Sequence, residues 1–279
     1  MLDLVQGDGP SAPTRDNSRY LTGSVQKAIS LLKAFSFDKR EYSLVELAHE
    51  TGLNVSTTHR LLATLEAEDL IERDPGNGHY RLAVKMFELG SVVLHGMELN
   101  TVGTPILARL ATETEDTTYF TVLTGHEVLC VARIEGVRHS RSQFLAVGRQ
   151  LPLHAGAGSK VLLAHLPAAR ARHILRDCSF TRYTESTICD PDRYMEELAL
   201  VQKQGYALSV GEITSGIIAI AAPIRQGPSD VVAAISLSGA KERYGAENLP
   251  AAIERVRDAA NQISFRLGYL PNLPGEGAF

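Results

Sequence analysis

The hydrophobic positions of residues 24–52 predict two short amphipathic helices. The first helix covers residues 24–35. Its apolar stripe consists of Val25, Ala28, Leu31, Leu32 and Phe35. The second helix begins at Ser43, where Glu46 three residues later completes a capping box. Gly52 ends it, because glycine readily adopts the left-handed conformation found after many helices.

A third helix and a hairpin follow directly. Asn54 is a good N-cap for a helix over residues 55–70, whose inward side is expected to hold Val55, Leu62 and Leu65. Residues 71–83 predict a short strand, a Pro-Gly-Asn-Gly turn and a second strand. Three helices followed by a hairpin is the order of a winged helix-turn-helix, and we assign residues 21–83 to such a domain.

The apolar residues after the hairpin predict one further helix over residues 84–100. They recur at spacings of four and three, which is a heptad seam formed by Leu82, Met86, Leu89, Val93 and then Gly96 or Met97. An ordinary amphipathic helix packed on its own domain shows the same pattern. A helix between two domains has no large core at hand, so we favour a linker helix that pairs with another subunit.

Helices and strands alternate beyond residue 101. Helices are expected near residues 102–114, 156–176, 191–204 and 246–267. Strands are expected near residues 118–124, 127–134, 142–147, 206–210, 217–224 and 231–238. Consecutive strands in two places suggest antiparallel hairpins. We therefore predict that residues 101–270 form an α+β domain with an antiparallel sheet rather than a doubly wound α/β domain.

Length and composition agree with a two-domain globular protein without a membrane segment. The chain has 279 residues, 44% hydrophobic and 22% charged. No apolar run approaches the roughly 20 residues needed to cross a bilayer. Residues 1–20 do not resemble a signal peptide, and they and the Pro/Gly-rich residues 271–279 are expected to be disordered tails. Three irregularly spaced cysteines indicate neither a disulfide framework nor a zinc ribbon, so a cytoplasmic location fits best.

Charge does not favour nucleic-acid binding. The net charge is −4, whereas attraction to phosphates normally supplies much of the affinity for DNA. A locally basic face can still exist if Arg60, Arg73, Arg81 and Lys85 converge while the acidic residues lie elsewhere. The DNA-binding prediction therefore rests on pattern. The second helix of a helix-turn-helix presents its first turns to base edges, and here those turns carry hydroxyl groups and an arginine that suits a guanine.

The candidate DNA-binding residues lie at the starts of two helices and on the hairpin. They are Ser43, Asn54, Ser56, Thr57, His59, Arg60, Arg73, Asn77, His79 and Arg81. The hairpin members are placed to reach sugar-phosphate or the minor groove. For any single residue, a solvated surface position is an equally good explanation, and His59 also suits a packed position. The prediction depends on the ordered set of capped helix, glycine turn, polar-faced helix and hairpin.

With these motifs in hand, the chain resembles the IclR family of bacterial transcription regulators. The resemblance covers about residues 24–267. It includes the segments SVQKAISLLKAF, LVELAHETGLNVSTTHRLLATLEAEDLIERD, YRLAVKMFELG, VGRQLPLHAGAGSKVLLAHLP, DPDRYMEELALVQKQGYAL, GIIAIAAPI and VVAAISLSGA. It implies a winged helix that binds double-stranded DNA, a GAF-like C-terminal domain that binds a small organic effector, and a homodimer or homotetramer. Such a dimer is expected to bind a palindromic operator.

The resemblance also implies an effector pocket. The segment LPLHAGAGSK corresponds to a small-residue turn at the family's pocket, which places Leu151, His154, Ala157, Gly158 and Ser159 near the ligand. Two pocket hydroxyls and an acidic position of the family correspond here to Ser236, Ser238 and Glu212.

Two departures from the family pattern make the expected pocket less polar. Ala219 stands where many members have a cysteine, and Ser209 stands where many have an aspartate. Ile217 and Ile218 add apolar bulk, although only one of two neighbouring strand residues can face the pocket. We expect an effector with an aromatic or aliphatic body and one polar end, for which a carboxylic acid is one candidate.

No motif in the sequence indicates catalysis, a cofactor or a metal. HAGAGSK lacks the phosphate-loop spacing, and Gly156 and Gly158 lack the third glycine of a dinucleotide-binding pattern. Ser159 beside Lys160 does not have the SxxK spacing, and the histidines form no metal-binding arrangement. Two other hypotheses stay open: a constitutive DNA-binding protein whose C-terminal domain only oligomerises, and a small-molecule enzyme whose winged helix contacts proteins.

Overall fold

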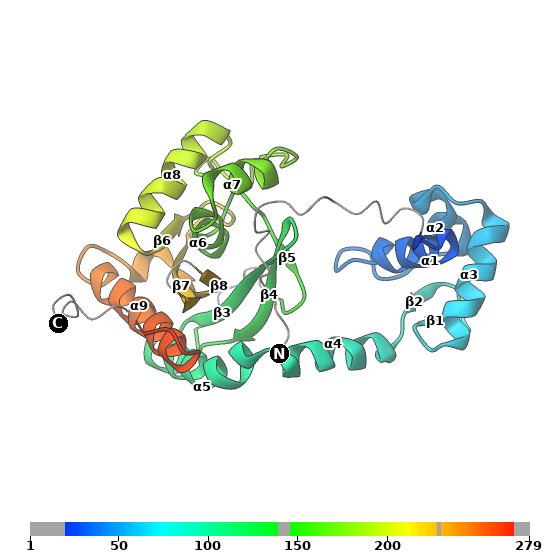
Figure 1. Cartoon of the computed structure of the whole chain (residues 1–279), viewed down its shortest axis with the longest axis horizontal. Helices are drawn as coiled ribbons and strands as arrows, with labels where there is room; N and C mark the ends of the chain where they lie inside the picture. Colours follow the sequence, from blue (N-terminus) through cyan, green and yellow to red (C-terminus); the bar gives the residue numbers. More distant parts are fainter. Residues whose placement is uncertain (1–19, 139–145, 228–229, 271–279) are drawn as a thin grey trace. The chain divides into compact units, whose positions relative to one another are not determined.

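The computed structural model describes residues 20–138, 146–227 and 230–270 (Figure 1). These residues form two compact units that divide between Gly96 and Met97. Apart from Tyr20, the two predicted tails lie outside the described residues, as does most of the strand expected at 142–147. In the part of the chain that the structure describes, no helix combines the length and the apolarity needed to cross a membrane.

The first unit contains the predicted winged helix-turn-helix. Its elements are α1 (Gly23–Ala34), α2 (Leu44–Thr51), α3 (Val55–Ala67), β1 (Ile71–Arg73) and β2 (Tyr80–Leu82). The two strands pair in antiparallel fashion, with Glu72 opposite Arg81. One core holds the three helices and the hairpin together, built from Leu31, Tyr42, Leu47, Leu62, Leu65, Ile71 and Tyr80. The predicted element order is confirmed.

Local hydrogen bonds explain where α2 and α3 begin and end. The Ser43 hydroxyl accepts from the Glu46 N–H, and the Glu46 carboxylate accepts from the Ser43 N–H, which is the predicted capping box. Gly52 ends α2 at φ +66°. Asn54 Oδ1 accepts from the Thr57 N–H at 2.8 Å and caps α3. All three predictions are confirmed.

Three details of the first unit differ from the expectations. The helix expected to run to residue 70 ends at Ala67. Val25 and Val55 were expected to face inward, but they are 54% and 47% exposed. Both residues lie in the first turn of their helices. At these helix ends the apolar side of the helix does not reach the core.

Helix α4 (Val84–Gly96) has no buried residue in its own chain. The single helix expected over residues 84–100 is two helices, because the backbone is extended at Met97 and α5 (Glu98–Thr114) begins directly after it. The seam residues Leu82, Leu89 and Val93 are 38–52% exposed. On the other side of α4, Val84 and Phe87 are each 72% exposed. Within one chain, therefore, α4 presents apolar side chains to solvent on both sides.

The second unit is built on one antiparallel six-stranded sheet, which confirms the predicted fold class. The strands are β3 (Thr117–Thr124), β4 (Glu127–Ile134), β5 (Gln150–Leu151), β6 (Ala207–Val210), β7 (Ile217–Gly227) and β8 (Asp230–Ala240), in the order β5-β4-β3-β8-β7-β6. The hairpins β3–β4 and β7–β8 are the two antiparallel pairs expected from the sequence.

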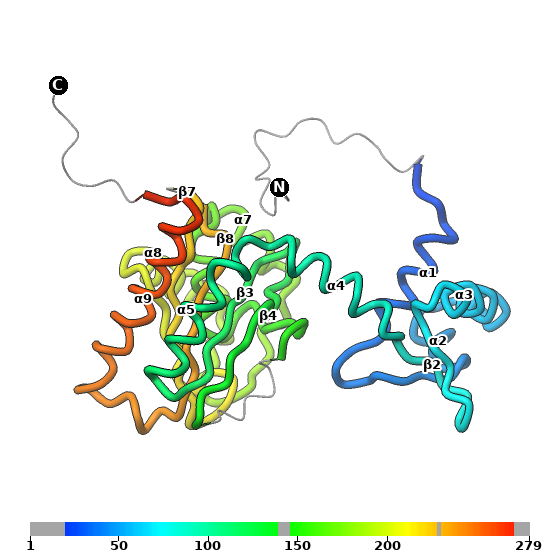
Figure 2. Tube along the Cα trace, turned by 90° about the horizontal axis from the view of Figure 1, so that it is seen from below, coloured from blue at the N-terminus to red at the C-terminus, as the bar shows by residue number. Residues whose placement is uncertain are grey.

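Helices cover both faces of this sheet (Figures 1 and 2). Helices α5 and α9 (Leu249–Arg266) lie side by side on one face, where Phe120 of β3 packs against Gly103 of α5. The other face is covered by α6 (Ala157–Ala164), with α7 (Ala168–Leu175) and α8 (Pro191–Gln204) beyond it. The helix expected over residues 156–176 is broken at Pro167, because proline interrupts a helix interior. Tyr119, next to Phe120, points to the α6 face.

Candidate functional site

The polar side of α3 is open within the first unit. Ser56, His59 and Arg60 are exposed and Thr57 is half-buried, whereas Thr58 of the same turn is fully buried. The alternation follows from the helical period, since Thr58, Leu62 and Leu65 share the side that packs on α1 and α2. The α3 residues predicted to contact DNA therefore lie together on one accessible face.

Arg81 and Lys85 are already paired with carboxylates. Arg81 Nε lies 2.5 Å from the Glu72 carboxylate, which raises the pKa of Arg81, and Arg81 Nη1 lies 3.9 Å from Glu41. Lys85 Nζ lies 2.7 Å from Glu88. These ion pairs weaken the basic face that the sequence required.

Arg60 and Arg73 keep more of their charge available. Among the described residues, Arg60 forms no ion pair. Arg73 Nε donates to the Gly78 carbonyl at 3.2 Å, and its guanidinium lies over the Tyr80 ring at 5.5 Å. Of the four basic side chains that the sequence analysis named, these two therefore keep the most charge for a phosphate.

Three of the candidate DNA-binding side chains are used to shape their own segments. The side chains of Ser43 and Asn54 cap helices, as described above. Asn77 Oδ1 accepts from the His79 N–H at 2.8 Å, in a turn where Asp74 Oδ1 accepts from Gly76 and Asn77. These last two bonds lower the pKa of Asp74. Ser43, Asn54 and Asn77 thus stabilise the helix starts and the hairpin turn, whatever else they contact.

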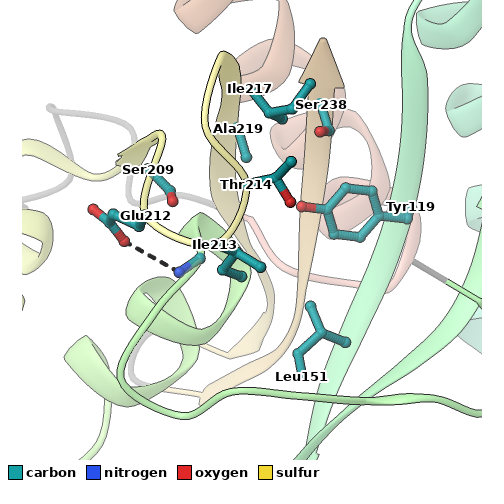
Figure 3. A pocket seen from close by; sticks show the side chains of 10 residues that line it. Tyr119, Leu151, Ser209, Glu212, Ile213, Thr214, Ile217, Ala219 and Ser238 are labelled. Atoms are coloured by element: carbon teal, nitrogen blue, oxygen red, sulfur yellow. Dashed lines mark hydrogen bonds between the residues drawn. The ribbon is translucent and has the colours of Figure 1, made fainter. Parts of the chain in front are cut away.

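A cavity lies on the α6 face of the sheet in the second unit, with an empty volume of about 400 Å³ including its mouth (Figure 3). It is lined by Tyr119, Leu151, Gly156, Ser209, Glu212, Ile213, Thr214, Ile217, Ala219 and Ser238. Six of these were predicted as effector-pocket residues: Leu151, Ser209, Glu212, Ile217, Ala219 and Ser238. The structure therefore brings together six of the eleven predicted positions.

Strand register explains why three of these positions meet. Ser209 of β6 pairs with Ala219 of β7, and Ala219 pairs with Ser238 of β8, so the three form one row across the sheet. Ile217 stands two residues before Ala219 and shares its face, while Ile218 points the other way and is buried. Directly paired strand residues project from the same side of the sheet, which gives the cavity a floor from three strands.

A buried ion network positions Glu212 at the cavity. Glu212 Oε2 accepts from the Gly156 N–H at 3.2 Å, drawn as the dashed line in Figure 3. Glu212 Oε1 lies 2.5 Å from Lys160 Nζ, and the same ammonium donates to Glu197 and to the Leu208 carbonyl, both at 2.9 Å. Lys160 is 1% exposed. The sequence predicted Glu212 as a pocket residue but did not predict its ion pair with Lys160.

His154 and Ser159 do not line the cavity. His154 Nε2 donates to the Thr181 carbonyl at 2.8 Å, and its ring packs against Phe180. Ser159 Oγ donates to the Pro152 carbonyl at 2.7 Å. Both side chains are buried and already bonded elsewhere, so for these two residues the structure does not bear out a place in the pocket wall.

Ala157, Gly158 and Ser236 are also outside the cavity lining. Ala157 is fully buried in the core between α6 and the sheet. Gly158 covers Ser236, since a Cβ atom at Gly158 would lie 3.3 Å from the Ser236 hydroxyl and 2.6 Å from Thr121 Oγ1. Ser236 shares the face of Ser238, but helix α6 lies on top of it. The pocket is therefore smaller along the strands than the sequence indicated.

Sequence reasoning missed four lining residues: Tyr119, Gly156, Ile213 and Thr214. Tyr119 pairs with Ser236, and only this register brings its phenol to the cavity. Burial raises the pKa of Tyr119, so the hydroxyl stays protonated and can donate. Ile213 and Thr214 stand in a loop between two glycines with positive φ, at residues 211 and 216, which was a detectable turn signal.

The cavity has the chemistry of a binding site for a partly apolar molecule. Its polar groups are hydroxyls, one carboxylate and backbone, and the described residues that line it include no lysine or arginine. Isoleucine and leucine side chains supply the remaining walls. Such a lining can enclose an apolar body and orient it through a few hydrogen bonds.

Comparison with known proteins identifies both units. Residues 24–75 match the model of the IclR helix-turn-helix domain, and residues 91–265 match that of the bacterial transcriptional regulator IclR C-terminal domain. The HTH-type transcriptional regulator XynR of Escherichia coli is 33% identical over 246 residues, covering 88% of this chain and 97% of that protein. KipR of Bacillus subtilis is 31% identical over the same shares.

Solved structures agree with these matches. An IclR homologue from Microbacterium hydrocarbonoxydans, complexed with 4-hydroxybenzoate, has a TM-score of 0.75 at 27% identity and covers 88% of this chain and 99% of its own. An IclR regulator structure from Silicibacter has a TM-score of 0.79 at 24% identity, covering 90% and 98%, and supports the fold. The chain belongs to the IclR family of bacterial transcription regulators, with a helix-turn-helix domain for DNA and the family's C-terminal effector domain.

Proposed function

We propose that this protein is a non-catalytic cytoplasmic regulator that binds a palindromic operator as a dimer or tetramer and responds to a small organic effector. In this proposal residues 21–83 bind DNA, the linker around α4 joins subunits, and residues 101–270 bind the effector. The observation that carries it is the accessible polar face of α3, with Arg60 free of any ion pair among the described residues. A coupling of about 1–3 kcal/mol between the two sites is enough for a useful switch.

The DNA-binding part is tested with Arg60→Ala. If Arg60 reads a guanine, the variant loses about 1–3 kcal/mol of binding to the operator and much less on random DNA of equal length. Arg81→Ala is the matched control, because the Arg81 guanidinium already pairs with Glu72. This variant is expected to change the ratio of the affinities for operator and random DNA little. Both are measured by fluorescence anisotropy at one salt concentration. Equal losses of Arg60→Ala on operator and random DNA would contradict base reading.

The assembly part is tested on the heptad seam of α4. Replacing Leu89 and Val93 by serine removes two apolar contacts that are 52% exposed in the single chain, and it lowers the molecular mass seen by analytical ultracentrifugation. Lys85→Ser on the same helix is the control, since Lys85 lies outside the seam and pairs with Glu88 of its own helix. An unchanged mass for the double variant would show that this seam does not join subunits.

The effector part is supported by the cavity and by the Microbacterium homologue, whose ligand is an aromatic hydroxy acid. We propose an aromatic or aliphatic molecule with one polar end, held by hydroxyls such as those of Tyr119 and Ser238. A panel containing 4-hydroxybenzoate is screened by thermal shift. A ligand at 100 times its Kd stabilises the protein by about 2.7 kcal/mol. Ala219→Leu fills the cavity and abolishes the shift, whereas tight binding of pyruvate or glyoxylate would contradict an apolar-bodied effector.

A further inference from the structure

Residues of α7, the turn after it and the start of α8 line a second cavity. Figure 1 labels both helices. Its empty volume, with open solvent at the mouth included, is about 540 Å³. It is lined by Arg172, Leu175, Arg176, Cys178, Phe180, Pro191 and Met195. None of these residues lines the cavity on the sheet described above. It is therefore a separate site with its own chemistry.

The walls of the second cavity combine apolar surface with positive charge. Leu175, Phe180 and Met195 are the apolar walls. Arg172 lies 3.7 Å from Asp192, in a pair so exposed that water screens it. Arg176 forms no ion pair with any residue in the described ranges. A small molecule with an apolar part and an anionic group fits this lining.

One lining residue, Cys178, is a nucleophile with a base beside it. Cys178 Sγ lies 3.4 Å from His154 Nδ1, while His154 Nε2 lies 2.8 Å from the Thr181 carbonyl. A carbonyl can only accept, so Nε2 carries a proton and Nδ1 of the neutral ring is free to accept the thiol proton. The ring packs against Phe180 and Tyr183, at centroid distances of 5.1 and 5.7 Å. A thiol, a base and a group that orients the base are the parts of an activated cysteine.

We propose that this cavity is a covalent modification site, where Cys178 reacts with small electrophiles that carry a carboxylate, such as α,β-unsaturated acids. The thiol proton passes to His154 Nδ1 while sulfur forms a bond to the β-carbon. The π electrons of the double bond move to the α-carbon, which then takes the proton back from His154. The addition is balanced without an oxidant or a leaving group, and Arg172 and Arg176 bind the carboxylate.

The test measures alkylation of the full-length protein by iodoacetate and iodoacetamide, with labelled cysteines quantified by peptide mass spectrometry. In this alkylation the cysteine sulfur displaces iodide from the reagent, and the thiol proton is released to the buffer. Cys189 is the internal reference, because its thiol contacts the Thr187 carbonyl, at 3.5 Å, rather than a base. Cys130 is fully buried, with its pKa raised to about 11, and stays unlabelled as long as the protein is folded. Cys178 is expected to react about tenfold faster than Cys189, or more.

Two variants separate activation from simple exposure. His154→Gln removes the base and slows Cys178 to the rate of Cys189, while unlabelled Cys130 reports an intact fold. Arg176 lies at the surface, and Arg176→Gln removes its charge while leaving His154 in place. It therefore lowers only the ratio of iodoacetate to iodoacetamide rates at Cys178, because only iodoacetate carries a carboxylate. Two results in the wild-type protein would show that the proposal is wrong. One is that Cys178 reacts no faster than Cys189. The other is that the ratio of iodoacetate to iodoacetamide rates is the same at Cys178 and Cys189.

Discussion

The buried ammonium of Lys160 makes a demanding prediction, because all three of its protons are used. They are donated to Glu212, Glu197 and the Leu208 carbonyl at 2.5, 2.9 and 2.9 Å. The Lys160 side chain is 2% exposed and that of Glu212 is 8% exposed, whereas that of Glu197 is 26% exposed. The pair of Lys160 and Glu212 is therefore largely shielded from water, whereas Glu197 can turn to solvent.

Lys160→Met keeps most of the side-chain volume and removes the charge. It leaves the Glu212 carboxylate with the Gly156 N–H at 3.2 Å as its remaining donor, and the Leu208 carbonyl without the ammonium. Breaking a buried ion pair by removing one partner costs about 3–5 kcal/mol. Glu197→Gln is the matched control in the same network. It costs about 1 kcal/mol or less, because water reaches that carboxylate.

The assay is urea unfolding of the full-length protein followed by circular dichroism, since the chain has no tryptophan. With a slope of about 2 kcal/mol per molar urea, the expected loss lowers the midpoint of the C-terminal unit by about 1.5–2.5 M. Lys160→Met combined with Glu212→Gln removes the stranded charge and recovers part of the loss. The reasoning fails if Lys160→Met costs less than about 1 kcal/mol, or if the added Glu212→Gln recovers nothing.

Two further predictions concern packing and pH. Gly103→Ala places a Cβ atom 2.8 Å from the buried Phe120 ring and destabilises the protein by about 1–3 kcal/mol, whereas Gly245→Ala, with nothing within 4 Å, changes the stability by less than about 0.5 kcal/mol. Chemical denaturation of both variants checks this, and equal effects would contradict it. Hydrogen bonds from Ser43 hold the pKa of Glu46 at about 2, below its usual 4.5, so its stabilising effect is present above pH 4.5 and lost toward pH 2. The difference in Tm between wild type and Glu46→Gln therefore narrows from pH 6 to pH 2.5, and a constant difference would rule out this role of the carboxylate.

Elements that depend on neighbours in the chain could be predicted from the sequence. The capping box at Ser43, the left-handed Gly52 and the Asn54 cap each involve residues within four positions of one another. Helix α8 and strand β4 occupy the same residues as the expected elements. Period and cap chemistry are local, so the winged helix-turn-helix, the antiparallel sheet and the polar face of α3 could be inferred without tertiary information.

The cavities and their charges depend on contacts between distant residues, which only the tertiary structure decided. Lys160 meets Glu212 across 52 positions, and Cys178 meets His154 across 24. Strand register decided that Tyr119 reaches the cavity, and the position of α6 decided that Ser236 does not. A residue's type determines which bonds it can form, but its partner depends on which segments the folded chain brings within a few ångströms, and periodicity along the sequence contains no such distance.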